Sequence, residues 1–270
     1  MPLTDMCNVV GSDRQLLIME RWRMHGRMPG HEVDISPVHR SKAQARATYD
    51  RISRYYDALE GNWEARARSE GLTMLAAGDG ESILEIGGGS GHSAITLAKR
   101  VGAAGRVYDL DLSPGMLDIV KARARQHQLL DRVLLTCGDA AYLPFAGGCF
   151  DAVFMSFVLE LFDTPEIAIV LAECRRVLRA GGRLCVVAMS RTYGLNLMGK
   201  LYEWGHRCFP SLLDCRPIPV QQILTQAGFE ILDASFLSLW GFAVEVALCT
   251  ACRCTCFQGK REQLPVDATR

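Results

Sequence analysis

The sequence has no excess charge of either sign, because 30 lysines and arginines balance 30 aspartates and glutamates. A neutral chain carries no global field that would draw it onto a nucleic acid or an anionic membrane. Aromatic residues make up only 8% of the chain, and they do not interleave with a basic stripe, so an RNA-binding surface is disfavoured. We expect a specific site for a small molecule and no nucleic-acid partner.

Long apolar runs are also missing. The most apolar late stretch, FLSLWGFAVEVALC (236–249), is interrupted by Glu245 and is too short to span a bilayer. The N-terminus lacks a continuous signal core, and Asp5, Asp13 and Glu20 argue against an organelle transit peptide. We therefore expect a cytoplasmic protein without a transmembrane segment; its oligomeric state does not follow from the sequence.

A disulfide framework is absent as well, although the chain has 11 cysteines. Seven of them are scattered, several inside apolar runs where a thiol is a small core side chain, and this favours a reducing compartment. The other four lie in CTACRCTC (249–256), where four thiolates suggest a tetrahedral metal site. Their spacing lacks the two separated pairs of a typical structural zinc site, so we expect no metal there.

The chain divides into three parts. Residues 1–40 lack periodicity and are expected to form a partly disordered arm, and 250–270 form a cysteine-containing tail. Residues 41–249 are expected to form the folded domain, with a helical lid over 41–80 and an insertion over 190–217 that borders the small-molecule site. Strands are expected at 82–87, 106–110, 132–136, 151–156 and 182–188, helices at 91–101, 114–127, 165–178 and 219–227, and two final strands that turn at Trp240-Gly241. This alternation predicts an α/β fold with a mostly parallel sheet covered on both faces.

Four glycines occur within residues 87–91, in the first loop from strand to helix, where open α/β sheets bind ligands. A phosphate-binding P-loop would need Lys followed by Ser or Thr after the last glycine, whereas His92 and Ser93 stand there. A dinucleotide fingerprint from Gly87 and Gly89 would need a small residue in place of His92. A dinucleotide-dependent oxidoreductase is therefore the weaker interpretation.

The remaining arrangement is Glu85-x-Gly87-x-Gly89-x-Gly91. Glycines let the backbone approach a ligand and turn sharply, which a Cβ would obstruct. An acidic residue at position 85 suits an ammonium group and would repel a pyrophosphate. The loop therefore suits a ligand with an amino-acid end.

A second carboxylate, Asp111, lies twenty residues beyond Gly91 at the end of the next strand. There it can accept hydrogen bonds from both hydroxyls of a ribose. Asp109 is the competing carboxylate. Helix N-capping is the alternative role for Asp111, although Ser113 is already a good cap.

Together these segments resemble the class I S-adenosylmethionine (SAM)-dependent methyltransferases. The glycine loop is similar to their motif I, and DLSPGM (111–116) to their Asp-x-Ser-x-x-Met segment. The match continues through CGDAAYLPF (137–145), FDAVFMS (150–156), LAECRRVLRAGGRL (171–184) and QAGF (226–229). The resemblance implies a Rossmann-like sheet of seven mostly parallel strands, helices on both faces, an antiparallel last strand, and SAM as the cofactor.

The same resemblance implies the cofactor contacts. Asp139 would face the adenine amino group, Ala140 would supply a backbone amide, and Met116 would pack near the base. The full set is Glu85, Gly87, Gly89, Ser90, Gly91, Asp111, Met116, Asp139, Ala140 and Ser156.

Within the family, the chain is most similar to the ubiquinone/menaquinone-biosynthesis C-methyltransferases, through YDRISRYYD (49–57), the Gly-Gly-Ser-Gly loop and SFVL (156–159). By position, Tyr49 and Tyr56 would close the site from above. The quinone enzymes typically follow Ser-Phe with Gly-Leu-Arg-Asn, whereas this chain has Val-Leu-Glu-Leu at 158–161, and its segment 201–217 also differs. Both departures fall where the acceptor should bind.

Methyl transfer chiefly requires that two reactants be aligned and water excluded, so no dedicated catalytic residue is compulsory. If a base is used, His206 is the candidate, with Tyr202, Trp204 and Arg216 as pocket walls. We expect methyl transfer from SAM to a small, partly apolar acceptor, foremost a quinol or phenol ring. The alternatives are a thiol or a lipid headgroup as acceptor and, more distantly, a dinucleotide-dependent oxidoreductase or a SAM-binding module without catalysis.

Overall fold

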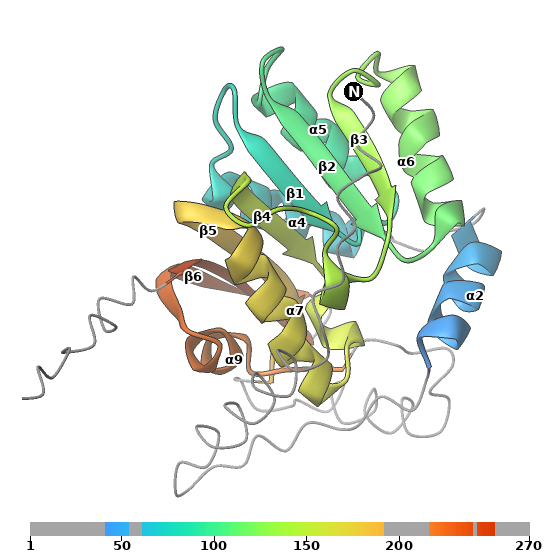
Figure 1. Ribbon diagram of the computed structural model, residues 1–270. Coiled ribbons are helices and arrows are strands. Elements are labelled where there is room, and N and C mark those ends of the chain that lie inside the picture. The colour runs from blue at the N-terminus through green and yellow to red at the C-terminus, as the bar shows by residue number, and fades with distance from the viewer. Residues whose placement is uncertain (1–40, 54–60, 192–215, 240–241, 252–270) are drawn as a thin grey trace, which may run out of the picture.

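The computed structural model describes residues 41–53, 61–191, 216–239 and 242–251. These residues form a seven-stranded sheet with the order β3-β2-β1-β4-β5-β7-β6 (Figure 1). Strands β1 to β5 pair in parallel, and β7 runs antiparallel to both β5 and β6. The strands are β1 (Ser82–Ile86), β2 (Arg106–Asp111), β3 (Val133–Cys137), β4 (Phe150–Ser156), β5 (Leu178–Met189), β6 (Phe229–Leu239) and β7 (Phe242–Ala251). The predicted α/β, Rossmann-like class with an antiparallel last strand is confirmed.

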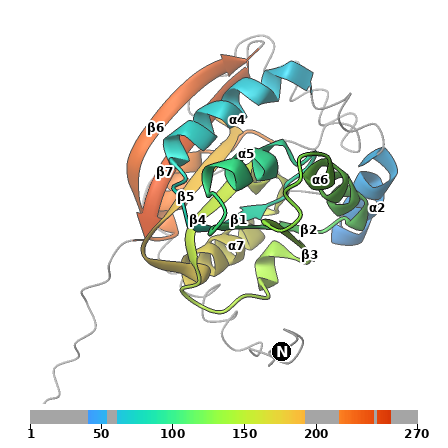
Figure 2. The same cartoon turned by 90° about the horizontal axis from the view of Figure 1, so that it is seen from above.

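Helices cover both faces of this sheet. Figure 2 shows α4, α5 and α6 on one face and α7 on the other, and the buried side chains of α9 pack in the same cluster as those of α7. The helices are α2 (Lys42–Ile52), α4 (Gly61–Leu75), α5 (His92–Arg100), α6 (Pro114–Gln126), α7 (Thr164–Val177) and α9 (Val220–Gln226), with the 3-10 helices η3 (Ala140–Tyr142) and η4 (Leu159–Leu161). Among the described helices, none has the length and hydropathy that crossing a membrane would need.

The strands alternate between two apolar clusters because successive side chains point to opposite faces. Ile83 and Phe154 pack with the α4–α5 side, whereas Leu84 and Val153 pack with the α7–α9 side. All four are fully buried. Burial on both faces explains why these strands are near-continuous apolar runs in the sequence.

The predicted helical lid over 41–80 is too broad. In this range α4 packs into the core, with Ala67 and Leu75 fully buried, and Gly71 lets the helix approach the sheet, since a Cβ there would lie 2.5 Å from Val187 Cγ2. Of the described helices, only α2 stands beside the sheet rather than on it, next to α6 (Figure 1). The N-terminal arm, most of the 190–217 insertion and the tail beyond residue 251 lie outside the described residues.

Candidate functional site

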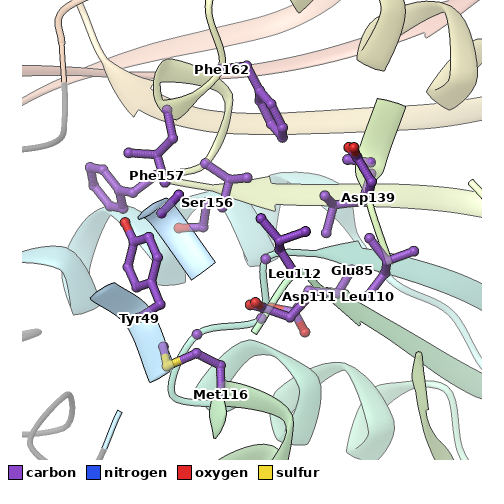
Figure 3. Close-up of a pocket in the computed structure, with 18 of the residues that line it drawn as sticks. Tyr49, Glu85, Leu110, Asp111, Leu112, Met116, Asp139, Ser156, Phe157 and Phe162 are labelled. Atoms are coloured by element: carbon purple, nitrogen blue, oxygen red, sulfur yellow. The ribbon is translucent and has the colours of Figure 1, made fainter. Parts of the chain in front are cut away.

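A pocket lies at the carboxyl ends of β1, β2 and β4, where parallel α/β sheets bind ligands. The glycine loop forms one wall, and side chains from α2, α4 and the loop after β4 form the others. In Figure 3, Tyr49, Ser156 and Phe157 gather on one side of the pocket, and Asp139 and Phe162 lie on the other. Of the predicted cofactor contacts, the lining includes Glu85, Gly87, Gly89, Asp111, Met116, Asp139, Ala140 and Ser156.

The glycine loop turns tightly under the pocket. The N–H of Gly87 donates to the carbonyl of Leu110 at 2.8 Å, which ties the loop to the end of β2. Gly87, Gly89 and Gly91 all have positive φ, at 69°, 55° and 80°, a backbone region that glycine enters without strain. Gly91 precedes α5 and, like the buried Ser90, does not belong to the pocket lining.

Asp111 lines the pocket and is partly buried. Its Oδ1 accepts from the N–H of Ser113 at 2.8 Å. Burial raises the pKa of Asp111 to about 6, against the lowering effect of backbone N–H groups from Ser113 and Gly89. The cap of α6 is Ser113, whose side chain accepts from the N–H of Met116. Asp111 is therefore not needed as a helix cap.

Asp139, at the far side of the pocket, is held by a cation that sequence reasoning missed. Lys42, in the first turn of α2, bonds to both Asp139 and Glu166. Burial lowers the pKa of Lys42, but the bonds to the two carboxylates outweigh it, so the pKa is raised. Lys42 thus fastens α2 across the edge of the pocket, while at its other end Asp50 accepts from Ser113. No sequence signal distinguishes Lys42 in its Ala- and Arg-rich segment.

We expect Lys42→Met to loosen α2 without unfolding the protein. Because the Lys42 side chain is 41% exposed, the ion pairs should contribute at most about 1 kcal/mol to stability. Hydrogen exchange should rise several-fold in α2, measured by mass spectrometry, while the melting temperature stays nearly constant. The matched control is Arg46→Met, because Arg46 makes only a 3.9 Å contact with Asp50 on the same helix. Equal exchange in both variants would contradict the assignment.

The wall after β4 is built on an unusual backbone. Phe157 has φ of +56°, a conformation that costs a non-glycine residue about 1–3 kcal/mol and occurs mostly at functional sites. Its N–H donates to Val187 on β5 at 2.7 Å, which holds the turn in place. The turn brings Phe157 to the same side as Tyr49 of α2 (Figure 3). Phe157 carries no sequence signal of its own, because positive φ follows from tertiary contacts.

Arg216 is a predicted pocket wall, but it is buried behind the post-β4 turn and does not belong to the pocket lining. Its guanidinium donates to the carbonyls of Glu160 and Phe162 and to Thr164 Oγ1. It braces this wall because a charged group so deeply buried must be satisfied by the surrounding acceptors. Tyr56, Tyr202, Trp204 and His206 lie outside the described residues.

Two further groups of α4, Glu64 and Arg68, also line the pocket. They are four residues apart and so lie on one face of the helix. Of the pocket-lining residues that the structure describes, Lys42 and Arg68 are the cations. No cluster of His, Cys, Asp or Glu suited to a metal ion occurs in the described ranges.

Comparisons with known proteins point to methyltransferases. A methyltransferase domain model matches residues 83–182. A demethylmenaquinone methyltransferase of Symbiobacterium thermophilum is 26% identical over 248 residues, which cover 81% of this chain and 96% of that protein. One of Lactococcus lactis subsp. lactis is 32% identical over 184 residues, which cover 60% of this chain and 71% of that protein.

Among solved structures, the [4+2]-cyclase SpnF is similar, with a TM-score of 0.65 and 18% sequence identity, over 82% of this chain and 99% of that one. A likeness at this identity shows a shared fold. It does not decide the reaction, because one fold hosts many chemistries.

Proposed function

The chain belongs to the class I SAM-dependent methyltransferases of the demethylmenaquinone methyltransferase type, and from this premise we propose that it methylates a small aromatic acceptor of the quinol class. The observation that carries the proposal is that Tyr49 and Phe157 lie on the same side of the pocket (Figure 3), which the glycine loop also lines. Two aromatic side chains suit a planar, partly apolar ring. The quinone acceptors in the names of the relatives agree with this chemistry.

The residues present suit SAM along the length of the pocket. Glu85 and the glycine loop offer a carboxylate and a close backbone for the amino-acid end, and a Cβ at Gly88 would lie 2.0 Å from Asp109 Oδ2, so no side chain fits there. Asp111 supplies acceptors for ribose hydroxyls. Asp139, with Ala140 beside it, stands at the adenine end. When bound, SAM supplies an electrophilic methyl group.

The chain's own contribution is to align the acceptor, exclude water and manage the acceptor's proton. Tyr49 and Phe157 would hold the ring, and α2, fastened by Lys42, would cover it. Arg68 suits either a carboxylate or a phenolate, because it is a guanidinium at the pocket wall. Glu64 on the same face of α4 suits proton transfer. His206 remains the predicted base on the insertion.

The proposal is tested by methyl transfer from labelled SAM to a matched acceptor panel. The panel contains a naphthoquinol with an unsubstituted ring carbon, a simple phenol, an alkyl thiol and a lipid amine. We expect kcat/KM to be highest for the naphthoquinol. A higher value for the thiol or the lipid amine would overturn the quinol assignment and leave the family assignment intact.

We expect Asp111→Asn to weaken SAM binding by about 1–3 kcal/mol, the usual effect of losing a charge-assisted hydrogen bond. The amide keeps an oxygen that can accept from Ser113, so the local turn should survive. Isothermal titration measures the affinity, with Asp118→Asn on the exposed side of α6 as control. Unchanged affinity would show that the ribose carboxylate lies elsewhere.

A further inference from the structure

Asp109 is a buried carboxyl that the proposed function does not use. It is 0% exposed, and neither oxygen has a hydrogen bond of good geometry within the described residues. An unpaired buried polar group is costly, and each such group in a native structure calls for an explanation. The position therefore invites a functional explanation.

The surroundings of Asp109 connect it to the cofactor pocket. A Cβ on Gly88 would lie 2.0 Å from Asp109 Oδ2, so the carboxyl sits directly behind this glycine. Gly88 itself lines the pocket. The backbone of a single residue thus stands between the carboxyl and the cavity, near the end that suits an amino-acid group.

The charged residues next to Asp109 along β1 and β2 are acidic. Glu85 is its direct neighbour on β1 in the parallel register, and Asp111 follows on β2; Asp50 of α2 acts on Asp111 in turn. On β3 the partner is Leu135, which is uncharged. At the start of α5 the side chain of His92 is exposed.

These surroundings favour the protonated carboxyl. Burial, together with the charge of Asp111, raises the pKa of Asp109 to about 8, although the nearby N–H of Gly88 opposes the rise. A cation bound on the pocket side of Gly88 would reverse this preference, because an opposite charge stabilises the carboxylate.

We propose that Asp109 tunes the charge of the cofactor site: it releases its proton to solvent when the ammonium end of SAM binds, and the resulting carboxylate strengthens the binding of that end. Asp109 acts through the glycine loop and is a positioning residue, not a catalytic one. The inference rests on the family's cofactor and is independent of the acceptor.

Calorimetric titration near neutral pH tests the proposal, with SAM and 5′-methylthioadenosine, which lacks the amino-acid end, each titrated in two buffers of different ionisation enthalpy. The difference between buffers gives the protons released on binding. Wild-type protein should release more protons with SAM than Asp109→Asn does, and the preference for SAM over 5′-methylthioadenosine should fall roughly tenfold in the variant, because the bound ammonium stabilises the Asp109 carboxylate. The exposed Asp118→Asn should behave as wild type.

A structural role alone would give a different pattern. Because the folded pKa is raised, the carboxyl destabilises the protein increasingly as pH rises from about 4 to 8. Without cofactor, Asp109→Asn should therefore melt at a higher temperature than wild type, with the larger gain at the alkaline end. Altered stability with an unchanged SAM preference and equal proton release would overturn the proposal.

Wild-type protein alone also tests the idea, should the variant fail to fold. Its proton release on SAM binding should decline once the pH passes about 8, where Asp109 is already ionised. Release that does not change across this range would overturn the assignment. The quinol proposal cannot affect these outcomes, because no acceptor is present; a wild-type protein that binds no SAM would overturn both.

Discussion

Replacing Gly87 with alanine is expected to abolish measurable SAM binding. Gly87 has φ of +69°, and a Cβ there would lie 2.4 Å from Cγ2 of Val158. Val158 is short and β-branched, so it cannot swing aside as a long side chain would. The loop and the post-β4 wall, which both line the pocket, would have to separate.

The expected loss of stability is about 2–5 kcal/mol, from left-handed backbone strain and overpacking together. Gly148→Ala is the matched control: its φ is +68° and nothing lies within 4 Å of the added Cβ, so it carries the strain alone. Chemical denaturation and calorimetric titration measure the two effects. SAM affinity within twofold of wild type in Gly87→Ala would show that the loop does not seat the cofactor.

The second large effect is expected at Arg216, which braces the wall after β4. Arg216→Met should destabilise the protein by about 3–5 kcal/mol, because buried acceptors on the 160–164 turn lose their donor. Methyl transfer should fall further than SAM binding, since the turn carries the acceptor wall at Phe157. Arg179→Met is the control, because Arg179 pairs with Asp151 at the surface and should contribute less than about 1 kcal/mol.

The effect of Arg216→Met should also depend on pH. Burial raises the pKa of Glu160 to about 7, and Arg216 opposes the rise. Because the pKa of Glu160 is higher in the folded than in the unfolded protein, the free energy of unfolding falls as the pH rises. Without the guanidinium of Arg216 the folded pKa of Glu160 should rise further, so the free energy of unfolding should keep falling to a higher pH. Urea denaturation should show a larger difference from wild type at pH 8 than at pH 5. Equal differences would mean that Arg216 does not act on Glu160.

Much of the fold follows from local patterns in the sequence. Local sequence signals mark the apolar strands, the Ser113 cap of α6 and the glycines with positive φ. These signals locate the corresponding elements to within a few residues. The strand bounds differ most at β5, which begins at Leu178 rather than 182. There the register shifts between Phe150 and Ala152 of β4, an irregularity that periodicity does not encode.

The sequence predicts the site residues that lie in or next to the strands, but not those whose roles depend on contacts between distant segments. Glu85 lies in β1, Asp111 ends β2 and Asp139 comes two residues after β3, so their positions come with the strands. Lys42 and Phe157 could not be found, because their roles depend on partners far away in the sequence. Lys42 of α2 bonds to Asp139 and Glu166, and the N–H of Phe157 donates to Val187 on β5. Arg216 belongs to the 190–217 insertion, and the sequence therefore predicts it at the pocket wall. Instead, its guanidinium is held by the acceptors of the post-β4 turn.

The most direct test of the account is a single turnover with SAM that carries a deuterated methyl group and an excess of the naphthoquinol. A protein described as a cyclase has a similar fold, so the fold alone does not decide the reaction. Detection of the transferred methyl group does. We expect S-adenosylhomocysteine and a methylated ring to appear in equal amounts, with the deuterated methyl found in the product by mass spectrometry. Tight SAM binding without S-adenosylhomocysteine formation, for every acceptor of the panel, would contradict the proposed methyl transfer.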